Sequence, residues 1–285
     1  MYVEFLVVFM PVFFLFLGMI QVSMMFSAKL VVQHAADAAA RSAIVVIPDD
    51  PGHYGGVDKS PKNQIDFADS SADSGGIIDR GLGFVESLGT GMSVTRRFST
   101  KGGPRLNAIR LAAYKPLMAV APSPSQVVSA GGAPSVRQAI GGAGARFAGG
   151  ILYNLTAVAV TFPTAPEATG VQTEGTQSFP VSRTSPANLT ARVTYLFHCA
   201  VPGAARLMCY NPLQLGSRDP EAFHELDAAM FPGAIAGYGA LRGCFYPMRA
   251  ESTLLYQGAD YQFRSEDSSA PAAGSPGSGS GGIGG

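Results

Sequence analysis

The 285-residue sequence contains no tryptophan and only three cysteines, and only 14% of its residues are charged. Three cysteines are too few for a disulfide-dense scaffold. Lys and Arg total 20, as do Asp and Glu, so no net field favours nucleic acid as a partner. Few residues are available for imidazole-based chemistry, because the chain has only four histidines: His34, His53, His198 and His224.

Familiar catalytic and ligand-binding motifs are also missing. His224-Glu225 lacks the second histidine of a zinc-protease helix, and neither G-x-S-x-G nor Cys-x-x-Cys occurs. The glycines of residues 141–150 lack the strand and the lysine of a phosphate loop. An acidic stretch fits no calcium-loop template and is expected to be a solvated loop; its carboxylates are Asp66, Asp69, Asp73 and Asp79. We therefore expect no catalysis, cofactor or metal, with a dispersed hydrolase site as a minor alternative.

The amino end carries the longest hydrophobic run. Residues 5–25 contain no charge, and about 20 apolar residues in a helix span a bilayer core. No Lys or Arg precedes the run, which favours a retained span over a cleaved signal peptide. Pro11 lies inside it and is expected to bend the helix, a role that membranes tolerate. Local melting at Pro11 during extraction from the bilayer is the alternative.

Helical periodicity continues beyond the run to Pro48, which predicts one rod over residues 1–47. Its second half has a small-residue face of the kind that lets helices approach closely. The residues expected to pack there, against the helices of other subunits, are Ala35, Ala36, Ala39 and Ala40. Near the start of the rod, Glu4 is a carboxylate at the edge of an apolar span, where it is either paired or solvated at the headgroups.

The first 45 residues or so resemble the TadE-like pseudopilins of Tad (Flp) pilus systems. The resemblance rests on Val3-Glu4-Phe5, on Pro11 and Gly18, and on QHAADAAAR at residues 33–41. It implies a non-catalytic, single-pass protein of the bacterial inner membrane whose exported domain follows the helix. Its partners would be the lipid bilayer, pilin-like subunits and other Tad assembly proteins. An anchored periplasmic binding module that never enters a filament is the alternative.

The family assigns Glu4 a register contact with the free amine of a neighbouring subunit, and Pro11 and Gly18 helix flexibility. In pilin-like proteins this glutamate is fifth after cleavage, whereas here it is the fourth residue. A prepilin peptidase is therefore an expected partner if a leader precedes Met1; otherwise this member escapes processing. Pairing the two charges would fix the register of stacked helices, because neither tolerates lipid alone.

The rest of the chain predicts a small exported α+β domain rich in loops. Gly and Pro number 35 and 20, about a fifth of the chain against roughly 12% in average proteins. Residues 48–103 are expected to be an irregular connection with one short apolar patch at 77–85, residues 104–264 the folded domain and residues 265–285 a disordered tail. The overall fold class is a long N-terminal helix followed by a small antiparallel sheet with one or two packing helices.

Within the folded domain, each expected element has its own signal. Helices are predicted over 104–122, which begins at a proline and is ended or kinked by Pro116, and over 134–150. Strands are predicted over 152–162, 189–199 and 249–255, with a further segment at 261–264. The segment over 189–199 alternates, with Arg192 and Thr194 on its polar face. The favoured disulfide joins Cys199 and Cys209 around a turn at Pro202-Gly203, with Cys244 as an alternative partner or three free thiols as the other outcome.

Overall fold

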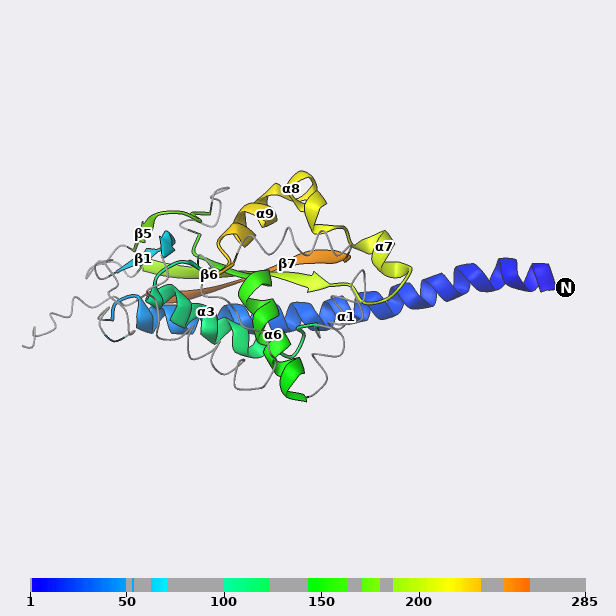
Figure 1. Ribbon diagram of the computed structural model, residues 1–285, viewed down its shortest axis with the longest axis horizontal. Helices are drawn as coiled ribbons and strands as arrows, with labels where there is room; N and C mark the ends of the chain where they lie inside the picture. Colours follow the sequence, from blue (N-terminus) through cyan, green and yellow to red (C-terminus); the bar gives the residue numbers. More distant parts are fainter. Residues whose placement is uncertain are drawn as a thin grey trace, which may run out of the picture.

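In the computed structural model, the first helix runs nearly the length of the molecule and the other elements gather around its second half (Figure 1). The structure describes residues 2–49, 53, 63–70, 100–122, 143–163, 171–179, 187–231 and 243–256. Helix α1 spans Tyr2–Val46 and passes through Pro11 without a break. It ends two residues before Pro48, close to the predicted boundary.

A three-stranded antiparallel sheet forms the centre of the domain. Strand β6 (Ala187–His198) lies between β4 (Val158–Thr161) and β7 (Phe245–Tyr256). The β6–β7 register pairs Arg192 with Glu251 and Thr194 with Arg249. Pro247 sits in β7, where a missing backbone N–H is tolerated because β7 is an edge strand. The predicted α+β class and antiparallel sheet are confirmed.

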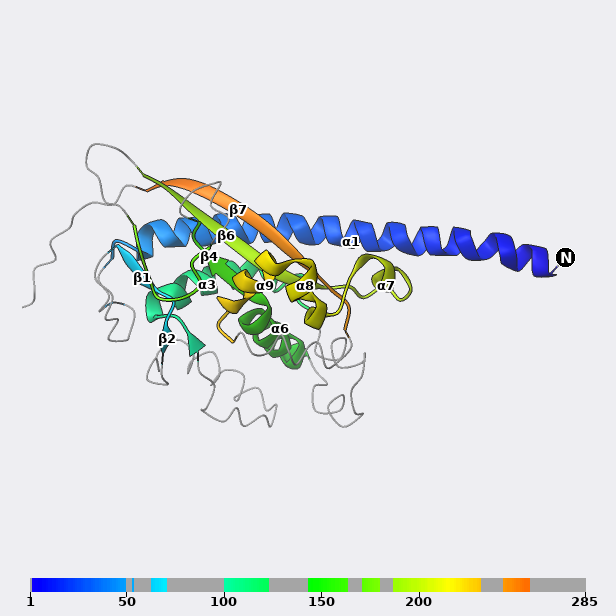
Figure 2. The ribbon, with the colours of Figure 1, turned by 90° about the horizontal axis from the view of Figure 1, so that it is seen from above.

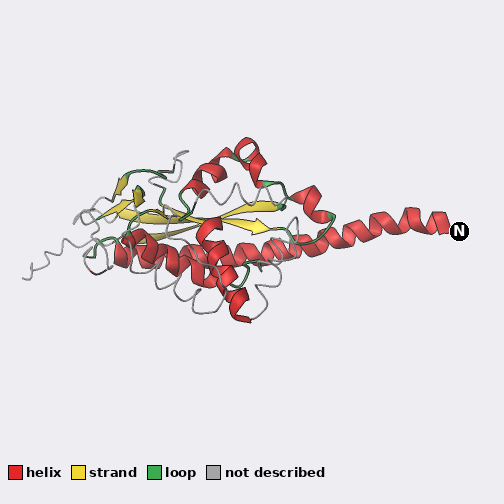
Figure 3. Ribbon diagram, in the orientation of Figure 1, coloured by secondary structure: helices red, strands yellow, loops and turns green. Residues whose placement is uncertain are grey.

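Helices cover both faces of this sheet (Figures 1 and 3). The second half of α1 and helix α3 (Pro104–Leu117) pack on one face, and helix α9 (Pro220–Asp227) packs on the other. The alternation predicted for β6 is visible in its contacts. Tyr195 points toward α3 and donates to the carbonyl of Val120, whereas Thr194 points to α9. Figure 2 shows β6 and β7 crossing α1 obliquely.

The strand predicted over 152–162 is wrong in its first half. Residues 152–157 belong to helix α6 (Ala143–Ala157), and only β4 is extended. Gly150, Tyr153, Asn154 and Ala157 are buried at helical spacing, and the Tyr153 hydroxyl donates to the carbonyl of Leu196. Burial on one helical face outweighs the weak strand preference of the segment. The helix predicted over 134–150 overlaps α6, and its part before residue 143 lies outside the described residues.

The predicted connection over 48–103 is not wholly irregular. It contributes β1 (Gln64–Asp66), which pairs with β5 (Thr176–Ser178), and β2 (Asp69–Ser70), which pairs with β3 (Thr100–Lys101). Strands of two or three residues carry no readable alternation, which explains why the sequence did not reveal them. The expected patch at 77–85, the strand at 261–264 and the tail at 265–285 lie outside the described residues.

Two buried arginines on α3 hold these connections in place. Arg105 donates to the carbonyls of Ile47, at the end of α1, and Gln64, in β1. Arg110 donates to the side chain of Asn107 and to the carbonyls of Lys101 and Ala228. Burial lowers the pKa of Arg110 to about 10 despite an opposing effect of Tyr114. The carbonyl ligands thus compensate these cations for lost water.

The remaining helices lie between β6 and β7 in sequence. Helix α7 (Ala204–Met208) is followed by a short 3-10 turn (Pro212–Gln214), by α8 (Leu215–Arg218) and by α9. Asp219 caps α9 by accepting from the backbone N–H of Ala222, and Pro220 occupies its first position. The predicted pair Cys199 and Cys209 is joined by a disulfide that closes the α7 segment, and Cys244 is free.

Candidate membrane and assembly interface

The N-terminal half of α1 extends away from the domain with its apolar side chains uncovered (Figure 1). Glu4 lies in the first turn and is exposed, and Pro11 is helical. Gly18 has open space around its Cα. The exposed large hydrophobic residues of this half are Phe5, Val7, Val8, Phe9, Met10, Val12, Phe13, Phe14, Leu15, Phe16, Met19 and Ile20. Phe5, Phe9 and Phe13 stack at successive turns.

This exposure distinguishes α1 from the core helix of a soluble protein. The segment Val7–Val46 is long and apolar enough to cross a membrane, and only 6% of its most apolar window is buried. A row of uncovered Phe, Val and Leu is unfavourable in water, at roughly 25 cal/mol per Å² of apolar surface, but suits lipid. The N-terminal helix therefore fits a single-pass membrane anchor.

The alanine face in the second half of α1 has a different partner from the one the sequence suggested. Ala35, Ala36, Ala39 and Ala40 are fully buried against the sheet and α3 of the same chain. They are thus packing residues, but they are not available to a neighbouring subunit. Short alanine side chains let α1 approach α3 and the sheet closely, and this demand of the domain accounts for the small-residue pattern.

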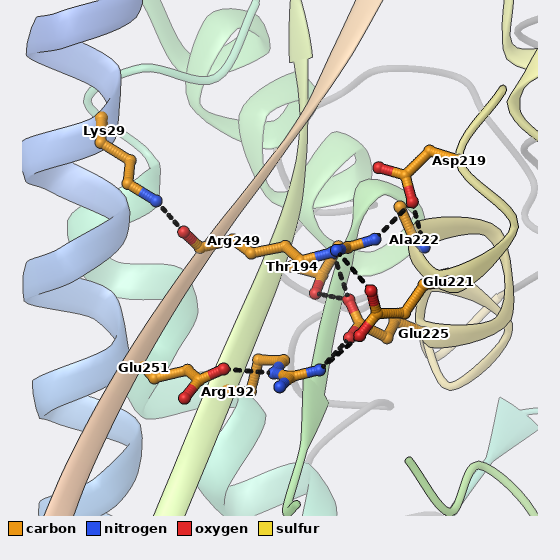
Figure 4. Close-up of polar contacts among 9 residues, drawn as sticks. All are labelled: Lys29, Arg192, Thr194, Asp219, Glu221, Ala222, Glu225, Arg249 and Glu251. Atoms are coloured by element: carbon orange, nitrogen blue, oxygen red, sulfur yellow. Dashed lines mark hydrogen bonds and ion pairs between the residues drawn. The ribbon is translucent and has the colours of Figure 1, made fainter. Parts of the chain in front are cut away.

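Polar contacts fix the rotation of α1 on the sheet. Lys29 donates to the carbonyl of Arg249 (Figure 4), and Gln33 donates to the carbonyl of Glu251 at 2.8 Å, so both bind the edge strand β7. The side of the helix opposite the alanine face is left uncovered. Its residues, which we call the outward stripe, recur at helical spacing: Met19, Phe26, Leu30, Arg41 and Val45. The outward stripe is therefore available for a helix–helix contact with another protein.

A buried ionic cluster on the far side of the sheet was not found from the sequence (Figure 4). Glu225 of α9 accepts from Arg192 at 2.6 Å and from Thr194 at 2.5 Å, and it lies 3.0 Å from Arg249. Glu221, one turn earlier, reaches both arginines as well. Burial lowers the pKa of Arg192, but Glu225 and Glu251 outweigh burial and raise it.

The cluster joins α9 to β6 and β7 as a structural element. Every described carboxylate in it faces an arginine, which is an arrangement for neutralising buried charge. The carboxylates that contact Arg192 follow it in the chain by 29 positions (Glu221), 33 positions (Glu225) and 59 positions (Glu251). The sequence contains one signal for this region: the Asp-Pro-Glu start of α9, which marks the beginning of a capped helix.

The other sequence candidates do not converge. Asp66 caps a turn by accepting from the N–H of Ala68, His53 lies 3.2 Å from Asp49, and His198 packs against Phe245. Asp73, Asp79 and residues 141–142 lie outside the described ranges. Among the described side chains, no group of three His, Cys, Asp or Glu residues could hold a metal ion.

Comparison with known protein families gives a match on this helix. A family described as TadE-like protein matches residues 2–41, which cover the exposed half of α1 and most of its packed half. No curated protein and no solved structure matches the chain. The resemblance noted in Val3-Glu4-Phe5, Pro11 and Gly18 is thereby confirmed, because residues 2–41 are similar to the TadE-like family.

Proposed function

We propose that the chain is a non-catalytic, membrane-anchored pseudopilin-like subunit for assembly of a Tad-type pilus. The observation that carries the proposal is the uncovered apolar half of α1, within the segment that matches the TadE-like family. In this proposal α1 anchors the protein in the bacterial inner membrane with its C-terminal domain exported. Pilin-like subunits and Tad assembly proteins are its partners, and a prepilin peptidase joins them if a leader precedes Met1.

Packing between subunits uses the outward stripe together with the lipid-facing half of α1. The alanine face is already occupied by the chain's own sheet and α3. Leu30 and Phe26 are both exposed on the outward stripe, one turn apart, so a second helix can bury both at once. Glu4 then pairs with the amino group of a neighbour and sets the axial register, while Pro11 and Gly18 allow the helix to bend.

Photo-crosslinking in cells that carry the pilus system tests this arrangement. A photoreactive residue at Phe26 or Leu30 should form adducts with pilin-like helices. The same residue at Leu111, which is exposed on α3, is the matched control and should not. Adducts from the Leu111 position with proteins outside the pilus system, combined with none from Phe26 or Leu30, would instead support the alternative of an anchored periplasmic binding module.

Glu4 has a separate test, because its role concerns assembly and not anchoring. The Glu4→Gln variant keeps the size of the side chain but removes its charge, so pilus number on the cell surface should fall. The amount of the subunit in the membrane fraction should stay at the wild-type level. Unchanged piliation at an unchanged subunit level would remove the register contact from the proposal.

A further inference from the structure

The disulfide-closed segment around α7 lies against the apolar half of α1. We call residues 200–208 the α7 loop. The backbone N–H of Val201 donates to Oε1 of buried Gln21 at 3.2 Å. Deeper along the helix, Gly203 faces Phe14 so closely that an added Cβ would lie 3.1 Å from the ring. In Figures 1 and 2, α7 is the labelled element of the domain nearest the protruding end of α1.

The position of Phe14 places the α7 loop beside membrane-spanning residues. The apolar run ends at Met25, and the eleven steps from Phe14 to Met25 correspond to about 16 Å of helix. The whole run over 5–25 is about 30 Å long, which matches a bilayer core. If that run lies in lipid, the α7 loop overlaps its outer half and must meet the outer leaflet.

The exposed side chains of the loop suit a lipid interface. Leu207 is 81% exposed, and Ala200 and Pro202 are exposed as well. The only charged residue in the loop is Arg206, and no Asp or Glu occurs from residue 199 to residue 218. An arginine beside an uncovered leucine can place its stem along acyl chains and its guanidinium among lipid phosphates.

The backbone of the loop is largely hydrogen-bonded within the protein, which a lipid environment requires. Ala205 donates to the carbonyl of Val201, Arg206 to that of Gly203, and Cys209 to that of Ala205. Gln21 supplies the acceptor for Val201. The disulfide fixes both ends of the segment at the edge of the domain. This explains the buried glutamine in an otherwise apolar run, since it serves the loop's backbone.

We propose that the α7 loop is a second membrane contact, in which Leu207 and Pro202 lie among the acyl chains of the outer leaflet and Arg206 extends toward lipid phosphate. The proposal rests on α1 as the membrane anchor in the proposed function. Its occupant is the lipid bilayer, because the loop is continuous with the uncovered apolar surface of α1. The contact holds the exported domain against the membrane and sets its height.

The absence of tryptophan makes a direct test simple. Three full-length variants each carry a single tryptophan, introduced by Leu207→Trp, Val12→Trp or Leu111→Trp, and are reconstituted into phosphatidylcholine–phosphatidylglycerol vesicles. One vesicle set contains lipids brominated near the ester groups and another contains lipids brominated near the chain ends. Retention of the Cys199–Cys209 disulfide and of the wild-type proteolysis pattern selects folded variants.

The expected result is loss of tryptophan emission from the 207 position with bromolipid, because the loop lies along the outer half of the run. Emission from the 12 position should be quenched by the deep bromolipid, and the 111 position should be quenched by neither. If the tryptophan at position 207 is quenched by neither bromolipid, like the one at position 111, the loop contact is overturned while the anchor stands. If the tryptophan at position 207 is shielded from aqueous iodide but insensitive to bromolipid, its neighbour is protein, and the loop contact is likewise overturned. An unquenched probe at position 12 overturns the anchor itself.

Discussion

Replacing Glu225 separates the effect of burial from the effect of ion pairing, because a matched residue lies one turn away. Glu221 and Glu225 are both on α9 and both contact Arg192 and Arg249. Their side chains differ in exposure, at 45% for Glu221 and 1% for Glu225. Removing one partner of a buried pair costs about 3–5 kcal/mol, whereas an exposed pair contributes about 0–1 kcal/mol.

We expect Glu225→Ala to lower the free energy of unfolding by about 3 kcal/mol, at the lower end of that range. The reason is that Arg192 retains Glu251, at 2.7 Å, and Arg249 retains Asp219, at 2.5 Å. Thr194 also loses the acceptor of its hydroxyl. The control variant, Glu221→Ala, should cost at most about 1 kcal/mol, since water replaces the exposed carboxylate.

Urea unfolding of the full-length chain in a mild detergent, followed by far-ultraviolet circular dichroism, measures both values. The disulfide is kept oxidised so that only the ionic cluster changes. Combining Glu225→Ala with Arg192→Ala in a double-mutant cycle gives the coupling between the two side chains. Equal destabilisation by the two single alanine variants would refute the reasoning, because burial would then not govern the strength of the pair.

Three further changes test other parts of the structure. Cys209→Ser opens the ten-residue loop and should lower stability by about 2–3 kcal/mol, measured by the same unfolding assay, with Cys244→Ser as the control. Gly203→Ala should lower the free energy of unfolding by about 1–3 kcal/mol, because Gly203 has a φ of 83° and faces Phe14. The control, Gly216→Ala, adds a Cβ that makes ordinary contacts in α8, so its effect on stability should be near zero. Burial lowers the pKa of His198 below its ordinary value of 6.5, so the unfolded chain binds the proton first as the pH falls. The free energy of unfolding should therefore decrease as the pH drops below 6.5 and stay level above it. His198→Phe should flatten this pH dependence in unfolding curves, and an unchanged slope would exclude His198 as its source.

Elements with long, regular patterns were the ones that the sequence predicted well. Charge-free residues and alanine spacing predicted α1 over 1–47, and it spans Tyr2–Val46. Strand β6 was expected over 189–199 and spans Ala187–His198. Helix α3 begins at the expected Pro104 and ends at Leu117, one residue after Pro116, which was expected to end or kink it. In these elements one burial pattern persists over many residues, and local preference agrees with it.

Features created only by tertiary contact were missed. The alanines were read as a surface for another protein, because a small-residue stripe does not state whose helix covers it. Likewise, Arg192 stood on the polar face of its strand, but nothing local connected it with Glu225, 33 positions away. The charge cluster and the α7 loop's approach to Phe14 depend on chain reversal between β6 and β7, which a single sequence does not specify.

Helix α1 is continuous from its protruding half to the half that Lys29 and Gln33 fix to the sheet. Each residue of an α-helix turns the chain by about 100°. Deleting or inserting one residue between Ile20 and Ala28 would therefore rotate Glu4 and the phenylalanine row by that angle about the axis relative to the domain. The number of residues in that short stretch therefore determines the direction in which a subunit presents its exported face.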